Sequence, residues 1–219
     1  MTKIPVCIFA KPPVAGRVKT RLARSIGESR AAELASAMLR DVWSSVARSP
    51  GVLPVLAAAE CGDFGIDVPE ERVWLQEPGN LGWRIECILR RGLETAPAAI
   101  ALGADAPLIT SLHLRDAING LQSGDATIGP CHDGGFYLLG LRRCPPRLLT
   151  EITWSSEHTR SETEARLASH GMTVARLGFL TDVDTVADLA QLSGELRKLP
   201  AGAAPRTRKW LDETGWSAS

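Results

Sequence analysis

The sequence predicts an α/β layered fold built on a mainly parallel sheet, with helices flanking the sheet. Residues 4–10 (IPVCIFA) and 98–105 (AAIALGAD) are short apolar runs, which are typical of strands buried on both faces. Between them, residues 28–47 place apolar side chains at helical spacing and therefore predict an amphipathic helix. Strand-like and helix-like segments then continue to alternate as far as residue 198.

The remaining elements follow from the same two periodicities. Further strands are expected at residues 54–59, 72–76, 125–130, 136–142 and 172–177. Further helices are expected at residues 81–93, 110–121, 161–169 and 186–198. Thr110 or Ser111 is the expected N-cap of the helix that ends near residue 121. The tripeptide Asp133-Gly134-Gly135 predicts a tight turn between two strands.

Residues 1–198 are expected to form one domain. The 219 residues, of which 44% are hydrophobic, suffice for a sizeable core, and no internal segment has the composition of a linker. Residues 199–219 form a tail, expected to be partly ordered, in which Trp210 and Trp216 stand among charged residues. These tryptophans either fold back on the domain or cover a neighbouring subunit, so the sequence leaves a homo-oligomer open.

The composition excludes several classes of function. Twenty-five basic and 25 acidic residues give a formal net charge of +0, which argues against a general nucleic-acid binder. No apolar run approaches the roughly 20 residues that a membrane span needs. The five cysteines are widely spaced and unpaired in sequence, which favours free thiols in a reducing compartment. We therefore expect a cytoplasmic protein that binds small molecules.

A basic loop follows the first predicted strand, in the sequence AKPPVAGRVKTRL (10–22). It lacks both glycines of a Walker A loop before Lys19, and it keeps only Gly16 of a dinucleotide fingerprint. It is closer to the G-T-R-L ending found in sugar-nucleotide enzymes, with Lys19 in the glycine position. Lys11, Lys19 and Arg21 carry charges that suit phosphate oxygens, and Gly16 permits a tight turn. The alternative is a solvated basic loop without a ligand.

Two segments offer carboxylates for a metal ion. Asp105 ends a buried strand, where it suits an oxygen-coordinated cation such as Mg²⁺ or Mn²⁺, although a turn or capping role is the alternative. Asp182 and Asp184 precede the last predicted helix, and capping of that helix is the favoured role for either, with Thr185 as a rival cap. Asp184 is also a candidate second ligand of the cation at Asp105.

The remaining candidates are weaker when taken one at a time. Asp133 lies in the predicted turn, for which a purely structural role is the alternative. Gln76 follows a predicted strand and either pairs with a base edge or simply ends the strand. Trp154 suits core packing, a lid or a sugar-binding surface equally well. In parallel sheets ligands bind beyond the carboxyl ends of the strands, and the basic loop, Gln76 and Asp105 are all expected there.

Taken together, these segments resemble one bacterial family in order and spacing. The resemblance rests on FAKPPVAGRVKTRLA, Q-x-x-G-N-L-G-x-R, GADAPLI, IGPCHDGGFYLLGL, ITWSS and DVDTVADL, and it extends from about residue 4 to residue 190. The family consists of small glycosyltransferase-A-like proteins, described as glycosyltransferases or as a domain of unknown function. It looks related to phospholactate guanylyltransferase and molybdenum-cofactor guanylyltransferase.

The resemblance implies a single-domain nucleotide-diphospho-sugar transferase (GT-A, Rossmann-like) fold and a divalent cation, Mg²⁺ or Mn²⁺. It implies a nucleotide or phosphate site made by Lys11, Gly16, Lys19, Arg21, Gln76 and Gly82. It also places Asp105 at the metal-binding aspartate of a D-x-D motif, with Asp184 as a second carboxylate. The chain departs from a full D-x-D motif, because Ala106 and Pro107 follow Asp105.

The expected reaction is therefore glycosyl transfer from a nucleotide-diphospho-sugar to a small-molecule acceptor. Arg21 and the cation are expected to stabilise the leaving nucleotide, and Asp133 is the candidate base for the acceptor hydroxyl. The first alternative is guanylyltransferase-like nucleotidyl transfer to a phosphorylated small molecule, which needs no base. The second is a non-catalytic nucleotide-binding protein, which the incomplete D-x-D motif suggests.

Overall fold

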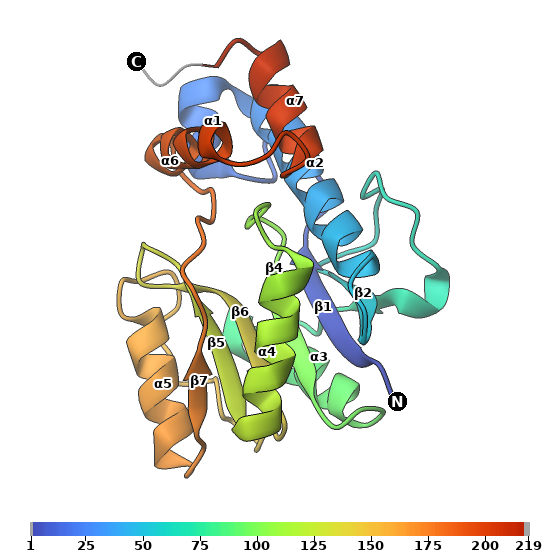
Figure 1. Cartoon of the computed structure of the whole chain (residues 1–219), viewed down its shortest axis with the longest axis vertical. Coiled ribbons are helices and arrows are strands. Elements are labelled where there is room, and N and C mark those ends of the chain that lie inside the picture. The colour runs from blue at the N-terminus through green and yellow to red at the C-terminus, as the bar shows by residue number, and fades with distance from the viewer. Residues whose placement is uncertain (1, 217–219) are drawn as a thin grey trace.

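A seven-stranded sheet runs through the centre of the computed structural model, which describes residues 2–216 (Figure 1). Its strand order is β3-β2-β1-β4-β6-β5-β7. The strands are β1 (Ile4–Ala10), β2 (Val52–Ala58), β3 (Val73–Leu75), β4 (Ala99–Gly103), β5 (Ala126–Pro130), β6 (Phe136–Leu141) and β7 (Val174–Arg176). Only β6 runs antiparallel to its neighbours β4 and β5, which confirms the predicted mainly parallel sheet.

Helices cover both faces of this sheet. They are α1 (Thr20–Ile26), α2 (Glu28–Ala47), α3 (Leu81–Leu93), α4 (Ser111–Ser123), α5 (Thr159–Ser169), α6 (Val186–Lys198) and α7 (Pro205–Glu213), with a short 3₁₀ helix η1 (Glu70–Arg72). Alternate residues of β1 point to opposite faces, as the strand period of two requires. Val6 and Ile8 pack in the core cluster that includes α2, α4, α6 and α7, whereas Cys7 packs on the opposite face, beside Ile88 of α3.

The predicted elements are confirmed in type, and their ends differ in places. The strands expected at 72–76 and 172–177 shorten to the three-residue strands β3 and β7 at the two edges of the sheet. The turn at Asp133 joins β5 and β6 as a hairpin, as expected, and Thr110 caps α4. Helix α1 was not expected, because its seven residues are too few to show a helical period.

The tail folds back onto the domain. Helix α7 packs along α2 (Figure 1). Trp210 of α7 is buried in the core cluster that α2 also joins. The carboxylate of Asp41 on α2 accepts hydrogen bonds from the backbone N–H and the hydroxyl of Thr207, each at 2.8 Å. The last three tail residues, 217–219, lie outside the described part of the chain. Within residues 2–216, no helix has the length and apolar character that crossing a membrane would require.

Candidate active site

A cavity of about 710 Å³ opens beyond the carboxyl ends of β1 and β4, where ligands of parallel sheets bind. The loop after β1 contributes Lys11 and Arg21, and the segment after β4 contributes Asp105. Asp133, from the β5–β6 hairpin, and the segment before α6 line the same cavity. A smaller hollow of about 320 Å³ adjoins it, between the basic loop and α2. Candidates that lie far apart in the sequence therefore meet in one cleft.

Lys19 lies at the centre of this arrangement. Its Nζ donates to Oδ2 of Asp105 at 2.8 Å and to Oδ1 of Asp184 at 2.7 Å. The lysine side chain is only 12% exposed, whereas those of Asp105 and Asp184 are 32% and 47% exposed. Burial alone would lower the pKa of Lys19, but the two carboxylates outweigh it and raise that pKa. The ammonium in turn lowers the pKa of Asp184, so Lys19 and Asp184 form a charged pair at neutral pH.

The backbone of the basic loop turns sharply to make this contact. Lys19 adopts a left-handed conformation, with φ of 47°, directly before α1 begins. Non-glycine residues take this conformation at some cost, so it marks a constrained position. Gly16, with φ of 77°, makes the preceding turn and faces the side chain of Glu28 rather than the cavities. Gly16 therefore shapes the loop, and its predicted contact with a nucleotide stays a prediction.

The other cations of the basic loop differ in whether they form an ion pair with a carboxylate. Arg17 pairs with Glu60 at 2.7 Å. Lys11 and Arg21 are exposed and line the cavity, and among residues 2–216 neither forms an ion pair with a carboxylate. These two side chains carry positive charge that the described protein groups leave available for an anionic ligand.

Asp133 and Asp182, which line the same cleft, form a second acidic group with Cys131. Ligand atoms of Cys131, Asp133 and Asp182 lie within 4.8 Å of one another. Burial, with added repulsion from Asp105 and Asp133, raises the pKa of Asp182 to about 7. Burial, together with the charge of Asp182, raises the pKa of the Cys131 thiol as well. Sequence reasoning did not include Cys131, because a buried thiol at the end of a strand gives no separate signal.

The favoured capping role for Asp182 and Asp184 is wrong. Thr185 is the N-cap of α6, and it forms a capping box with Asp188. The hydroxyl of Thr185 accepts the Asp188 backbone N–H at 3.3 Å, while the Asp188 carboxylate accepts the Thr185 backbone N–H at 2.7 Å. Because Thr185 and Asp188 satisfy the helix terminus, the carboxylate of Asp184 is left to face Lys19.

Gln76 lies in a hollow of about 160 Å³ that adjoins the main cavity beside Lys11. Its amide nitrogen donates to the carbonyl of Ala57 at 2.7 Å, and its amide oxygen accepts from Arg84 at 3.3 Å. Gly82 lines neither this hollow nor the main cavity. A β-carbon at Gly82 would collide with the carbonyl of Leu149, so the glycine admits a neighbouring loop against α3.

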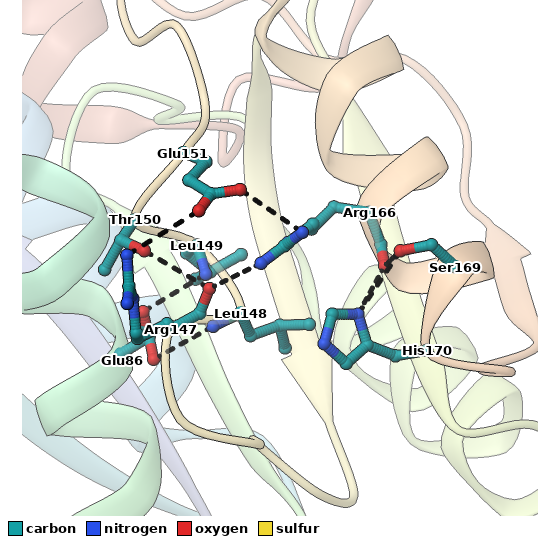
Figure 2. Close-up of polar contacts among 9 residues, drawn as sticks. All are labelled: Glu86, Arg147, Leu148, Leu149, Thr150, Glu151, Arg166, Ser169 and His170. Carbon is teal, nitrogen blue, oxygen red and sulfur yellow. Dashed lines mark hydrogen bonds and ion pairs between the residues drawn. The ribbon is translucent and has the colours of Figure 1, made fainter.

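That loop, residues 142–158, forms one wall of the cavity and is held by a buried carboxylate (Figure 2). Glu86 of α3 is fully buried and accepts the backbone N–H groups of Leu148 and Leu149 at 3.2 and 3.1 Å. Arg166 of α5 adds a hydrogen bond to the carbonyl of Arg147 at 3.2 Å. The anchored loop carries Trp154 to the cavity wall, where its ring packs edge-on against Phe136.

The family described as "uncharacterized protein conserved in bacteria (DUF2064)" matches residues 34–156, which is more than half of the chain. The chain belongs to DUF2064. This confirms the resemblance drawn from the sequence motifs. Among curated proteins, no significant match to this DUF2064 chain exists.

Solved structures agree with this membership. The crystal structure of a "putative nucleotide-diphospho-sugar transferase" from Desulfovibrio desulfuricans G20 is 27% identical, with a TM-score of 0.86, and the match covers 98% of this chain and 96% of that one. This similarity confirms the predicted nucleotide-diphospho-sugar transferase fold.

Two more distant structures show the fold alone. CMP:2-keto-3-deoxy-manno-octonic acid synthetase complexed with CTP is 14% identical, with a TM-score of 0.55 and coverage of 90% and 99%. Rv0371c complexed with manganese, from Mycobacterium tuberculosis H37Rv, is 19% identical, with a TM-score of 0.50 and coverage of 87% and 97%. At the coarse level of enzyme class, the neighbours of this DUF2064 chain support a transferase.

Proposed function

We propose that this DUF2064 protein is a glycosyltransferase that uses a nucleotide-diphospho-sugar donor and a divalent cation. One observation carries the proposal: the cleft beyond β1 and β4 brings together the cations Lys11 and Arg21 and the convergent carboxylates of Asp105 and Asp184. A donor with a diphosphate needs both features, because its phosphates require positive charge and its cation requires oxygen ligands. The description of the 27% identical neighbour supports the same donor class.

The residues fit a magnesium or manganese ion best at Asp105 and Asp184. One oxygen of each carboxylate converges on a single point, the position of the Lys19 Nζ atom, and hard oxygen ligands suit these ions. The trio of Cys131, Asp133 and Asp182 includes a thiol, which suits softer metals. When bound, the cation would offset the negative charge of the donor phosphates.

The side chains of this chain then have separate roles. Lys11 and Arg21 would hold the diphosphate, and Arg21 would stabilise the charge that develops on the leaving nucleotide. Asp133, exposed at the hairpin, would take the proton of the acceptor hydroxyl. Trp154, on the anchored wall, would cover the donor sugar or the acceptor on its apolar side.

Nucleotidyl transfer to a phosphorylated small molecule is the second candidate, and one observation favours it. Asp133 lies beside Asp182 and already accepts the Gly135 backbone N–H at 2.8 Å, which suits a binding role as well as that of a base. A phosphate acceptor is already ionised and needs no base. In that reaction, Lys11 and Arg21 would stabilise charge at the α-phosphate.

A thermal-shift panel of nucleoside triphosphates and nucleotide sugars, each with and without Mn²⁺, tests the proposal. A ligand at 100 times its dissociation constant adds about 2.7 kcal/mol of stability, which is readily measured. A metal-dependent shift with one nucleotide sugar is the expected result. A shift with triphosphates alone would favour nucleotidyl transfer, and binding without turnover of any donor would indicate a non-catalytic protein.

Two variants and one control variant sharpen this test. Arg21→Met should abolish the shift caused by the donor, whereas Arg24→Met, an exposed arginine of the same helix outside the cavity, should keep it. Asp133→Asn should lower transfer to a hydroxyl acceptor by about 10²–10⁴-fold and transfer to a phosphate acceptor far less. Equal losses in both assays would make Asp133 a binding residue.

A further inference from the structure

We propose that Lys19 is a built-in counter-ion that competes with the divalent cation for Asp105 and Asp184. In this inference, cation binding displaces the Lys19 ammonium from the carboxylates into the cleft. The inference rests on the metal site of the proposed function and adds a resident competitor to that site.

The geometry places the ammonium where the cation ligands converge. The Nζ atom lies 2.8 Å from Oδ2 of Asp105 and 2.7 Å from Oδ1 of Asp184, so it contacts both oxygens directly. A divalent cation bound to the same two oxygens would lie within a few ångströms of the ammonium. Two positive groups so close, in a partly buried site, repel each other strongly, so both cannot hold this position.

Exposure indicates which group would move. The Asp105 and Asp184 side chains are about one-third and one-half exposed, so a cation from solvent can reach them. The Lys19 side chain is 12% exposed, but it ends a flexible stem and lines the hollow that adjoins the main cavity. Its sequence neighbours Thr20 and Arg21 line the main cavity. A displaced ammonium would therefore enter the space where donor phosphates are proposed to bind.

The arrangement gives a reason for the incomplete D-x-D motif. With only one aspartate after β4, the second carboxylate comes from Asp184, 79 residues later in the chain. Lys19 holds these two like-charged groups together in the absence of a cation. The cation then finds a preformed pair of ligands, and its net affinity is lowered by the cost of displacing the ammonium.

The test is a titration with Mn²⁺ in the absence of nucleotide. The electron paramagnetic resonance signal of free Mn²⁺ measures how much of the ion is bound. Lys19→Met should bind Mn²⁺ at least about tenfold more tightly than wild type, because the competing charge is gone. Lys19→Arg should bind as weakly as wild type. Arg21→Met also removes one positive charge from the cleft but contacts neither carboxylate, so its gain should be smaller than that of Lys19→Met.

Two double variants identify the ligands. The gain of Lys19→Met should disappear in Lys19→Met/Asp184→Asn and persist in Lys19→Met/Asp182→Asn. Equal Mn²⁺ affinity in wild type and Lys19→Met would overturn the inference. A gain that depends on Asp182 instead would also overturn it, since the cation would then bind at the Cys131–Asp133–Asp182 trio.

The wild-type protein offers a second readout that no folding defect can confuse. Amine acetylation, read by peptide mass spectrometry, should modify Lys19 faster when Mg²⁺ is added, while exposed Lys198 at the C-terminal end of α6 serves as the internal reference. No change in the ratio of the two rates would overturn the inference. Both experiments use the metal alone, so they stand or fall independently of whether any nucleotide sugar shifts the melting temperature.

Discussion

Lys19 and Glu86 are both ionisable side chains that are largely removed from water, yet their partners differ in kind. Glu86 is fully buried, and its carboxylate is bound by two backbone N–H groups of the loop at residues 142–158. Lys19 is bound by two carboxylates that remain open to the cleft. Backbone partners cannot leave without unfolding the loop, whereas side-chain partners can exchange for another ion. Glu86 therefore fixes the structure, whereas Lys19 is available for chemistry.

The largest expected effect is on the structural side of this comparison. Glu86→Ala leaves two buried N–H groups without an acceptor, and each should cost about 1–3 kcal/mol, so the free energy of unfolding should fall by about 2–6 kcal/mol. Glu86→Gln keeps one acceptor oxygen and should lose less. Denaturant unfolding measures both. A Glu86→Ala protein as stable as wild type would show that the loop does not depend on this carboxylate.

Substitution of Lys19 should have the opposite balance of effects, with a large loss of activity and a small loss of stability. Lys19→Met should lower turnover of the donor found in the panel by about 10²–10³-fold, the usual cost of losing one charge-stabilising donor. Its free energy of unfolding should change less than that of Glu86→Ala, because the two carboxylates it leaves are partly solvated. Steady-state kinetics and unfolding on the same preparation measure both effects. If Lys19→Met lost activity only in proportion to its loss of stability, Lys19 would have a structural role like that of Glu86.

Asp41 is a second buried carboxylate that, like Glu86, binds backbone N–H groups and should have a structural role. It is 4% exposed and binds the backbone N–H of Thr207 at the start of α7. Asp41→Ala should lower the free energy of unfolding by about 1–3 kcal/mol and leave transfer activity intact. The matched control is Asp212→Ala on the exposed face of α7, which should change neither quantity. Loss of activity in Asp41→Ala without loss of stability would contradict this grouping.

The smallest expected effect concerns pH. The Thr110 backbone N–H donates to Nδ1 of His113 at 3.1 Å, and burial, only partly offset by Asp116, lowers the pKa of His113 below 6.5. The unfolded chain therefore binds a proton at a higher pH than the folded one, so this contribution to stability is lost as pH falls below about 7.

We expect the loss between pH 7.5 and pH 5.5 to stay below about 1 kcal/mol, the scale of a helix cap. His113→Gln keeps a capping side chain that does not titrate, so its stability should fall less over the same interval. Unfolding of both proteins at the two pH values checks this. Identical pH profiles would show that His113 keeps its ordinary pKa.

The sequence predicted the parts of the site that depend on strand ends. Asp105 follows an apolar strand, and the basic loop follows another, so parallel pairing alone brings them to one edge of the sheet. The contacts of Lys19 could not be predicted in this way, because they join residues 86 and 165 positions apart. Glu86 carries no sequence signal either, since its partners are backbone groups of a loop without periodicity.

Local competition between caps explains the misassigned role of Asp184. Thr185 and Asp188 both lie within one turn of the start of α6, and a reciprocal capping box satisfies two N–H groups where one aspartate would satisfy one. Helix α7 was missed because Trp210 and the charged residues around it resemble a mixed tail until α2 is placed beside them.

The hydrogen bonds between the Asp41 carboxylate and Thr207 have a consequence for biosynthesis. The two residues are 166 positions apart, and Trp210 completes the same core cluster that α2 begins. During synthesis from the N-terminus, the part of α2 that packs against α7 therefore stays uncovered until nearly the whole chain has left the ribosome. The nascent chain therefore exposes apolar surface until α7 docks. Ribosomes stalled shortly before residue 205 should carry intermediates that recruit chaperones.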